Sequence, residues 1–202
     1  AIRRELTRLY DYPRASAPVA RGSRYFFTRN DGLQNQPVLY VQNGLDGTPR
    51  VLLDPNSLSA DGTIALTGWE PSADGRLLAY AVSSGGSDWQ EIHVRDVAGG
   101  VDRGDRLQWA KFVTISWRAD SSGFYYTRFP DNGHYHPAVY AHRLGAPQSS
   151  DRVGFAGSED PESVYEIDQS SDHRVLAVTA FKGASENSTV FVVGGRQIGS
   201  FE

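Results

Sequence analysis

The sequence predicts an all-β fold, a β-propeller of about four blades with four antiparallel strands each. After residue 13, short segments rich in β-branched and aromatic residues alternate with clusters of Gly, Pro, Asp, Asn and Ser. No segment beyond that point has a convincing helical period, which favours an all-β fold over alternating strands and helices. A unit also recurs about every 50 residues, a period typical of four-stranded propeller blades. A β-sandwich with a coincidental spacing is the alternative.

The first 13 residues are expected to form a linker with a short helical segment. Ile2, Leu6 and Leu9 lie at helical spacing, and Pro13 and Pro18 prevent the helix from continuing. Turn residues and short apolar runs then follow one another. The next strands are expected at residues 24–29, 37–42 and 50–53.

The recurring unit contains a Ser/Asp/Gly turn that leads into a strongly apolar strand. Asp74 and Asp120 are 46 residues apart, and Asp172 follows 52 residues later. A less regular copy surrounds Gly22, which lies 53 residues before Gly75. In such turns Asp or Ser bonds to neighbouring backbone groups and Gly adopts a positive φ. The expected blades are residues 14–60, 61–108, 109–157 and 158–202.

Composition excludes several function classes. The formal net charge is −4, from 20 basic and 24 acidic residues, so no nucleic-acid surface is expected. No apolar run approaches the roughly 20 residues of a membrane-spanning helix. Zero cysteines exclude a disulfide framework and a thiolate metal site. We therefore expect no nucleic-acid or membrane partner, no metal or other cofactor, and a cytoplasmic location.

The five histidines do not predict a metal site. His134 and His136 stand two residues apart and could chelate a metal from one face of a strand. They lie, however, in a loop-like segment without accompanying carboxylates. His93 and His142 lie in alternating strands and are expected to be half-exposed surface residues, whereas His173 is expected in a turn.

Serine and carboxylate groups are expected to have structural roles. Ser87 and Asp88 are expected to cap a turn, because no His is placed to act as a base. A glycosidase would use a carboxylate pair, but the candidate acids are expected to be charged groups of solvated loops. These acids are Asp102 with Asp105, and Glu159 with Asp160 and Glu162. The tryptophans are expected to pack mostly between blades, and they are Trp69, Trp89, Trp109 and Trp117.

Several longer motifs indicate a family. They are LYDYP at 9–13, RYFF at 24–27 with GLQNQPVLY at 32–40, LDPN at 53–56, LSADGTIA at 58–65, GSDW at 86–89 and RLGAPQS at 143–149. In order and spacing they resemble the propeller domain of prolyl oligopeptidases, from residue 6 to about 155. The resemblance implies a large cytosolic serine peptidase that cleaves short peptides after proline, with an α/β-hydrolase domain capped by seven blades. This chain is then a partial or truncated propeller preceded by a little of the linker.

No catalytic residue is expected in this chain. The segments nearest to a G-x-S-x-G nucleophile elbow are GGSDW at 85–89 and GASEN at 183–187, and both lack the last glycine. The resemblance implies that the triad belongs to a hydrolase domain outside these residues, and that the propeller gates access to it. This chain alone is then inactive.

The partners implied by the resemblance are that hydrolase domain and, through the parent enzyme, short proline-containing peptides. The chain contains no methionine, so an excised or engineered piece of a larger protein is expected. Closure of four blades on themselves and self-association through open blades are alternatives. The alternative function is a stand-alone or engineered propeller that serves as a scaffold or interaction module.

One substrate-binding residue is expected, Phe112. Residues 109–117 read WAKFVTISW, and the family has a matching V-K-F-S segment whose phenylalanine forms an apolar wall of the substrate pocket. The resemblance transfers this role to Phe112, with Thr114 nearby, at the start of an inner strand expected at 112–117. Burial of Phe112 in the core between blades is the alternative.

Overall fold

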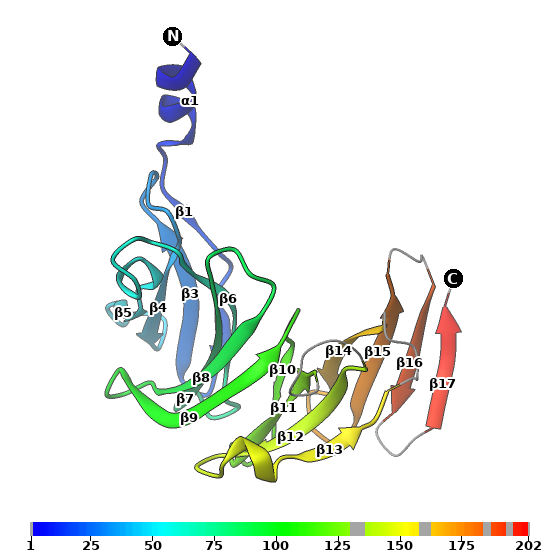
Figure 1. Ribbon diagram of the computed structural model, residues 1–202. Coiled ribbons are helices and arrows are strands. Elements are labelled where there is room, and N and C mark those ends of the chain that lie inside the picture. The colour runs from blue at the N-terminus through cyan, green and yellow to red at the C-terminus, as the bar shows by residue number, and fades with distance from the viewer. Residues whose placement is uncertain (1, 130–135, 158–162, 184–186, 193–195, 202) are drawn as a thin grey trace.

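The computed structural model describes residues 2–129, 136–157, 163–183, 187–192 and 196–201. One helix, α1 (Ile2–Tyr10), precedes four antiparallel sheets, each made of strands that follow one another along the chain. The sheets lie side by side in an open, curved row that ends at β17 (Figure 1). The predicted all-β propeller architecture is confirmed, and the row of described strands does not close into a ring.

The first sheet contains five strands, one more than the expected four, because β1 and β2 both pair with β3. Its strands are β1 (Arg14–Ala15), β2 (Val19–Arg21), β3 (Arg24–Asn30), β4 (Val38–Asn43) and β5 (Arg50–Leu53). The second sheet contains β6 (Ile64–Pro71), β7 (Leu77–Ser84), β8 (Gln90–Asp96) and β9 (Val101–Ala110).

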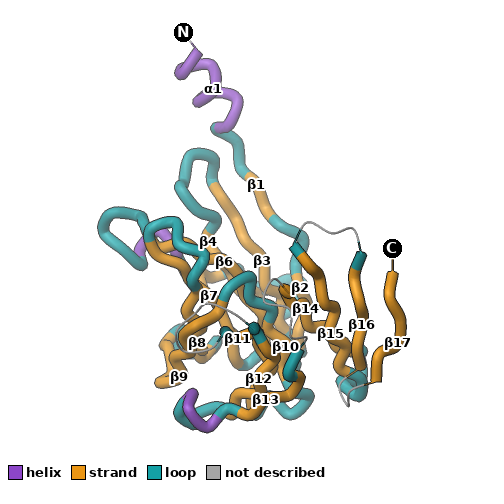
Figure 2. Tube along the Cα trace, turned by 45° about the vertical axis from the view of Figure 1, so that its right-hand side comes forward, coloured by secondary structure: helices purple, strands orange, loops and turns teal. Residues whose placement is uncertain are grey.

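The third and fourth sheets have four strands each. The third contains β10 (Ile115–Trp117), β11 (Gly123–Arg128), β12 (Ala138–Arg143) and β13 (Arg152–Phe155). The fourth contains β14 (Ser163–Gln169), β15 (Leu176–Lys182), β16 (Ser188–Val192) and β17 (Arg196–Phe201). Two 3-10 turns, η1 (Pro55–Ser57) and η2 (Gln148–Ser150), precede β6 and β13. Helix α1 lies at one end of the row and projects away from the sheets (Figure 2).

Both faces of the second sheet are buried, which explains why β7 is apolar at almost every position. Leu77, Ala79 and Ala81 face the third sheet, whereas the alternate residues Leu78 and Tyr80 face the first. A third apolar cluster, which includes Val139 of β12 and Tyr165 of β14, joins the third sheet to the fourth. Each sheet therefore packs face to face against its neighbours in the chain, as propeller blades do.

The recurring turn has one backbone conformation with three different side chains. Gly75, Ser121 and His173 follow the equivalent aspartates, and their φ angles are +68°, +54° and +55°. Each donates its N–H to the carbonyl three residues earlier, over 2.8–2.9 Å. Glycine was expected at this position, but the third copy places Ser121 there, and Gly123 begins β11 instead. The hydrogen bonds of the aspartate and the backbone define the turn. They hold a residue other than glycine in this strained backbone conformation.

Candidate functional site

Two aromatic residues with left-handed backbones lie at the junction of the second and third sheets. Trp109 has φ +63° near the end of β9, and Phe112 has φ +46° before β10 begins. A bulky residue in this region costs about 1–2 kcal/mol, so two within four positions indicate a conformation fixed by its surroundings. Such strain concentrates at functional sites.

Rings from three strand ends gather around this junction. The Trp89 ring, just before β8, meets the Trp109 ring edge to face at 5.6 Å and the Phe129 ring at 5.7 Å. The Lys111 ammonium lies 4.1 Å from the centre of the Trp89 ring. We call Trp89, Trp109, Lys111, Phe112 and Phe129 the aromatic rim. Aromatic pairs and cation–π contacts of this kind each contribute about 0.5–1.5 kcal/mol.

Two hydrogen bonds from backbone N–H groups hold the rim in place. The Phe129 N–H donates to the Trp109 carbonyl over 2.8 Å, and the Val113 N–H donates to the Gln90 side-chain oxygen over 3.0 Å. The Val113 bond attaches the segment between β9 and β10 to β8, and the Phe129 bond joins the third sheet to β9. This segment presents the Lys111 ammonium and the Phe112 ring on a fixed support.

Phe112 is 57% exposed, so its alternative placement in the core between blades is wrong. The inner strand expected at 112–117 is also shorter, because the left-handed turn delays β10 until Ile115. Thr114, expected near the same pocket, donates its hydroxyl to the Tyr165 carbonyl over 3.3 Å and so contacts the fourth sheet. Phe112 is exposed to solvent, whereas Thr114 forms a hydrogen bond between the third and fourth sheets.

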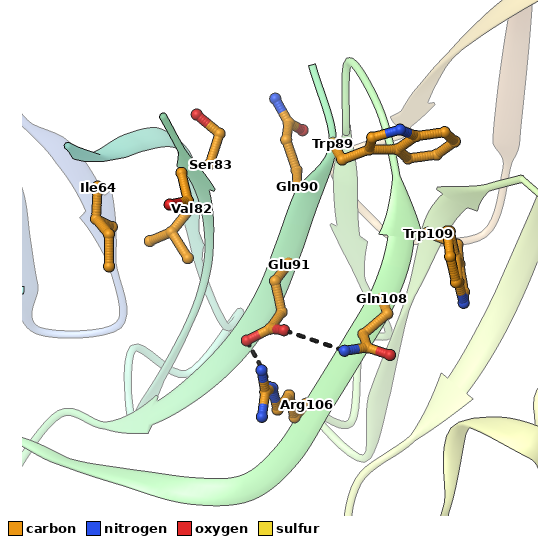
Figure 3. A pocket seen from close by; sticks show the side chains of 10 residues that line it. Ile64, Val82, Ser83, Trp89, Gln90, Glu91, Arg106, Gln108 and Trp109 are labelled. Carbon is orange, nitrogen blue, oxygen red and sulfur yellow. Dashed lines mark hydrogen bonds and ion pairs between the residues drawn. The ribbon is translucent and has the colours of Figure 1, made fainter. Parts of the chain in front are cut away.

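A pocket of about 390 Å³ adjoins the rim on the second sheet. Figure 3 shows Trp89 and Trp109 at one side of it and Glu91, Arg106 and Gln108 along its floor. The Glu91 carboxylate accepts from Arg106 over 2.7 Å and lies 2.8 Å from the His93 ring nitrogen. Partial burial opposes ionisation of Glu91, but bonds from Arg106 and Gln108 keep its pKa below the ordinary value. This acid is therefore an ionised partner of Arg106 and is not poised for proton transfer.

The rim departs from the expectation that the tryptophans pack mostly between blades. Trp117 does so: it is buried, and its indole N–H donates to the Glu70 carbonyl over 2.9 Å. Trp69 packs against the cluster between the first two sheets. Trp89 and Trp109, by contrast, lie at the rim. Gln90 pairs with Ala110, so the tryptophan before each of them lies close to this pair, but the bulges between β8 and β9 prevent the contact from being counted from the sequence alone.

His142 was expected to be a half-exposed surface residue, and this is wrong. Its side chain is 0% exposed and bridges two buried carboxylates. The Nδ1 atom lies 2.8 Å from Asp151, and Nε2 lies 3.1 Å from Asp105 on β9. Because both ring nitrogens face carboxylate oxygens, both donate and the ring is an imidazolium. Burial lowers the pKa of His142, but the two carboxylates outweigh this effect and the net pKa is raised.

The candidate carboxylates are held by other partners. Asp105 was expected in a solvated loop but lies on β9, where it is buried beside His142. Asp102, also on β9, accepts from Arg95 over 2.7 Å and from the Tyr80 hydroxyl over 2.9 Å. The other predicted acids, Glu159, Asp160 and Glu162, lie outside the described residues.

The remaining predicted candidates are dispersed. His93 lies on β8 beside Glu91, and His173 occupies the fourth turn. His136 is exposed, and its potential partner His134 lies outside the described residues. The Ser87 hydroxyl accepts from the Trp89 N–H over 3.1 Å, as a turn cap does. Within the described segments no three His, Asp or Glu side chains are grouped as metal ligands, and no helix is long and apolar enough to cross a membrane.

Comparison with known proteins identifies relatives of the whole chain. Residues 1–199 match the family described as "Prolyl oligopeptidase, N-terminal beta-propeller domain". The chain is 34% identical over 194 residues to a prolyl endopeptidase of Elizabethkingia meningoseptica, covering 92% of this chain and 27% of that protein. It is 33% identical over 210 residues to a dual function macrocyclase-peptidase of Galerina marginata, covering 90% of this chain and 29% of that protein.

Solved structures agree with the sequence relatives. A structure from a study of two prolyl endopeptidases superposes with a TM-score of 0.84 at 38% identity, covering 95% of this chain and 28% of that one. The apo prolyl oligopeptidase B of Galerina marginata gives a TM-score of 0.79 at 32% identity, covering 98% of this chain and 32% of that one. The chain thus spans less than a third of the length of these relatives.

Proposed function

The chain belongs to the prolyl oligopeptidase family, in which it matches the N-terminal β-propeller domain, and we propose that it covers the active site of a serine peptidase that cleaves short peptides after proline. The catalytic triad is supplied by a hydrolase domain outside these 202 residues. The sheets restrict which peptides reach that domain and keep bulk water from the reacting bond. We further propose that the peptidase acts in the cytoplasm.

The aromatic rim is the observation that supports a direct role in substrate binding. Exposed Phe112 and the Lys111 ammonium are held in a strained, hydrogen-bonded segment that has little reason to persist for stability alone. Binding sites combine apolar walls with a few fixed polar groups. Phe112 therefore contributes an apolar wall to the peptide site, and Lys111 a positive charge beside it.

Helix α1 is the surface that fits the hydrolase partner. Ile2, Leu6 and Leu9 recur at i, i+4 and i+7, and each is at least half exposed. The helix projects away from the four sheets (Figure 1), and none of its residues is buried. An exposed apolar stripe of this kind is typical of a surface that contacts another protein surface. The catalytic domain is the proposed cover.

Two experiments test this function. The purified chain is expected to leave a proline-containing chromogenic peptide uncut. Turnover that a serine-directed inhibitor abolishes would refute the assignment of catalysis to a separate hydrolase domain. In the full-length enzyme, Phe112→Ala is expected to raise KM several-fold, because the wall is lost, while kcat changes little. Leu45→Ala, at a residue that is 76% exposed in the loop between β4 and β5, is the control. Equal kinetic effects of the two substitutions would remove Phe112 from the substrate site.

The alternative, a stand-alone propeller that acts as an interaction module, is tested by the oligomeric state. Open blades are expected to associate if no catalytic domain covers them. Sedimentation at several concentrations distinguishes a monomer of 22.2 kDa from a dimer. A stable monomer that does not bind a family hydrolase domain would oppose both the gating role and self-association.

A further inference from the structure

A second pocket, of about 380 Å³, is lined by three arginines on the third sheet. They are Arg118, which follows β10, Arg143 at the end of β12, and Arg152 at the start of β13. We call these three residues and the cavity that they line the arginine pocket. The aromatic rim precedes β10, whereas Arg118 follows it, so the arginine pocket lies at the opposite end of this sheet.

Strand register places the three guanidinium groups on one face. Arg152 pairs with Ala141, and Arg143 stands two residues after Ala141 on the same strand, so both point to the same side. Tyr125 also pairs with Ala141, and the Arg118 guanidinium lies over the Tyr125 ring at 5.9 Å. This face looks toward the fourth sheet, but β14 of that sheet packs on the inner strands β10 and β11. The outer strands with Arg143 and Arg152 remain accessible, and Arg118 is exposed just after the end of β10.

The pocket carries an excess of positive charge. No carboxylate of the described residues lies within ion-pair distance of Arg118, Arg143 or Arg152. The acid in the lining, Asp151, is bonded by the Tyr126 hydroxyl over 2.7 Å and by His142 over 2.8 Å.

Asp120, two residues after Arg118, interacts electrostatically with Arg118. Its carboxylate already accepts from the Ser122 N–H over 3.0 Å and from the Ser122 hydroxyl over 2.6 Å. Arg118, Arg143 and Arg152 thus form no ion pair among the described residues, in a chain whose net charge is −4. Such a local excess has a cost unless an anion binds there.

We propose that the arginine pocket binds a small free anion that carries phosphate groups. The planar guanidinium group donates two parallel hydrogen bonds to phosphate oxygens, and three such groups on one face can surround a multiply charged anion. The volume exceeds the needs of a single phosphate, so an anion with two linked phosphates fits better. The site is independent of the peptide site, because it involves none of the rim residues.

Titration calorimetry of the purified chain with inorganic pyrophosphate and with inorganic phosphate at low salt tests this site. Pyrophosphate is expected to bind with one-to-one stoichiometry and more tightly than phosphate, and salt is expected to weaken both. Arg143→Gln and Arg152→Gln are each expected to weaken pyrophosphate binding by about tenfold or more, because a charge-assisted bond is lost. Arg152→Lys is expected to retain part of the pyrophosphate affinity, since lysine keeps the positive charge but cannot donate two parallel hydrogen bonds.

Arg4→Gln on α1 is the matched control, because it removes the same charge from an exposed arginine outside any described pocket. It is expected to leave pyrophosphate binding unchanged. The absence of saturable pyrophosphate binding, or an equal loss in Arg4→Gln, would overturn the site. Tighter binding of a phosphoserine peptide than of pyrophosphate would overturn its assignment to a free anion. Thermal unfolding of each variant checks that the fold is kept.

Discussion

Replacing His142 by glutamine is expected to destabilise the contact between the second and third sheets strongly. The imidazolium spans from Asp105 on β9 to Asp151 before β13, and all three side chains are at least 98% buried. The Asp105 carboxylate also accepts the Gly145 N–H, and the Asp151 carboxylate accepts the Tyr126 hydroxyl. A neutral amide leaves two buried carboxylates without a cation between them.

The magnitude follows from the two bonds that are lost. A hydrogen bond to a charged group contributes about 1.5–3 kcal/mol, and removing one partner of a buried ion pair costs about 3–5 kcal/mol. We therefore expect a loss of about 3–5 kcal/mol in the free energy of unfolding for His142→Gln. That is a large part of the roughly 5–15 kcal/mol typical of a folded domain.

The same geometry predicts a pH dependence with a definite sign. The pKa of His142 is raised in the folded state, although burial alone would lower it, because Asp151 and Asp105 favour the charged ring. The resulting stabilisation is complete below the unfolded pKa of about 6.5 and is lost as pH rises through the higher folded value. Wild-type stability is thus expected to fall above neutral pH, and His142→Gln is expected to lack this fall. Arg103, 3.7 Å from Asp105, and the arginines that line a pocket with His142 and Asp151 are further cations near the cluster, and they stay charged throughout.

Urea unfolding between pH 5.5 and pH 8.5, followed by tryptophan fluorescence, measures both effects. His93→Gln is the matched control, because His93 is paired with Glu91 at 2.8 Å but is partly exposed. The control is expected to cost less than about 1 kcal/mol. The reasoning is refuted if the two substitutions cost the same, or if wild type and His142→Gln show the same dependence on pH.

Four further predictions concern other contacts. Ser121→Gly should raise the melting temperature by a few degrees, because it relieves a φ of +54° and removes a buried hydroxyl that has no hydrogen-bond partner among the described residues. Gly75→Ser at the equivalent position should lower it, since a Cβ there meets a backbone oxygen of the first sheet at 2.5 Å. Glu70→Gln should change stability by less than about 1 kcal/mol at pH 7 in urea unfolding, because burial already raises the pKa of Glu70 despite its bond to an arginine. Lys111→Met should alter the near-ultraviolet circular dichroism of the rim, because the cation lies 4.1 Å from the Trp89 ring, yet cost less than about 1 kcal/mol.

The fold could be predicted from the sequence because its determinants are local. The aspartate of each recurring turn bonds to a backbone N–H two residues later, as Asp74 does to Arg76 over 3.0 Å, so the turn is visible as a short motif. The apolar run of β7 likewise reflects burial on both faces of one strand. Repetition of these local signals identifies the number of sheets without any knowledge of how they pack.

The sites could not be predicted to the same degree because they depend on contacts between sheets. The position of His142 in an alternating strand predicts a surface histidine. In the structure it is buried beside Asp105, which lies 37 residues away in the sequence and on another sheet. Phe112 was identified through a family motif, whereas its exposure results from a left-handed turn that no residue pattern indicates. The Trp89–Trp109 contact needs the register of β8 with β9, which follows from the hairpin only once its bulges are known.

The row of sheets has an uneven distribution of apolar contact. In the described part of the chain, the second and third sheets share clusters with neighbours on both sides, whereas the first and fourth share a cluster with one neighbour only. Amide protons of β7 and β11 should therefore exchange with deuterium far more slowly than those of β16, whose residues are all partly accessible. Opening from the ends inward leaves the central pair, with the imidazolium between its carboxylates, as the last unit to lose its protection.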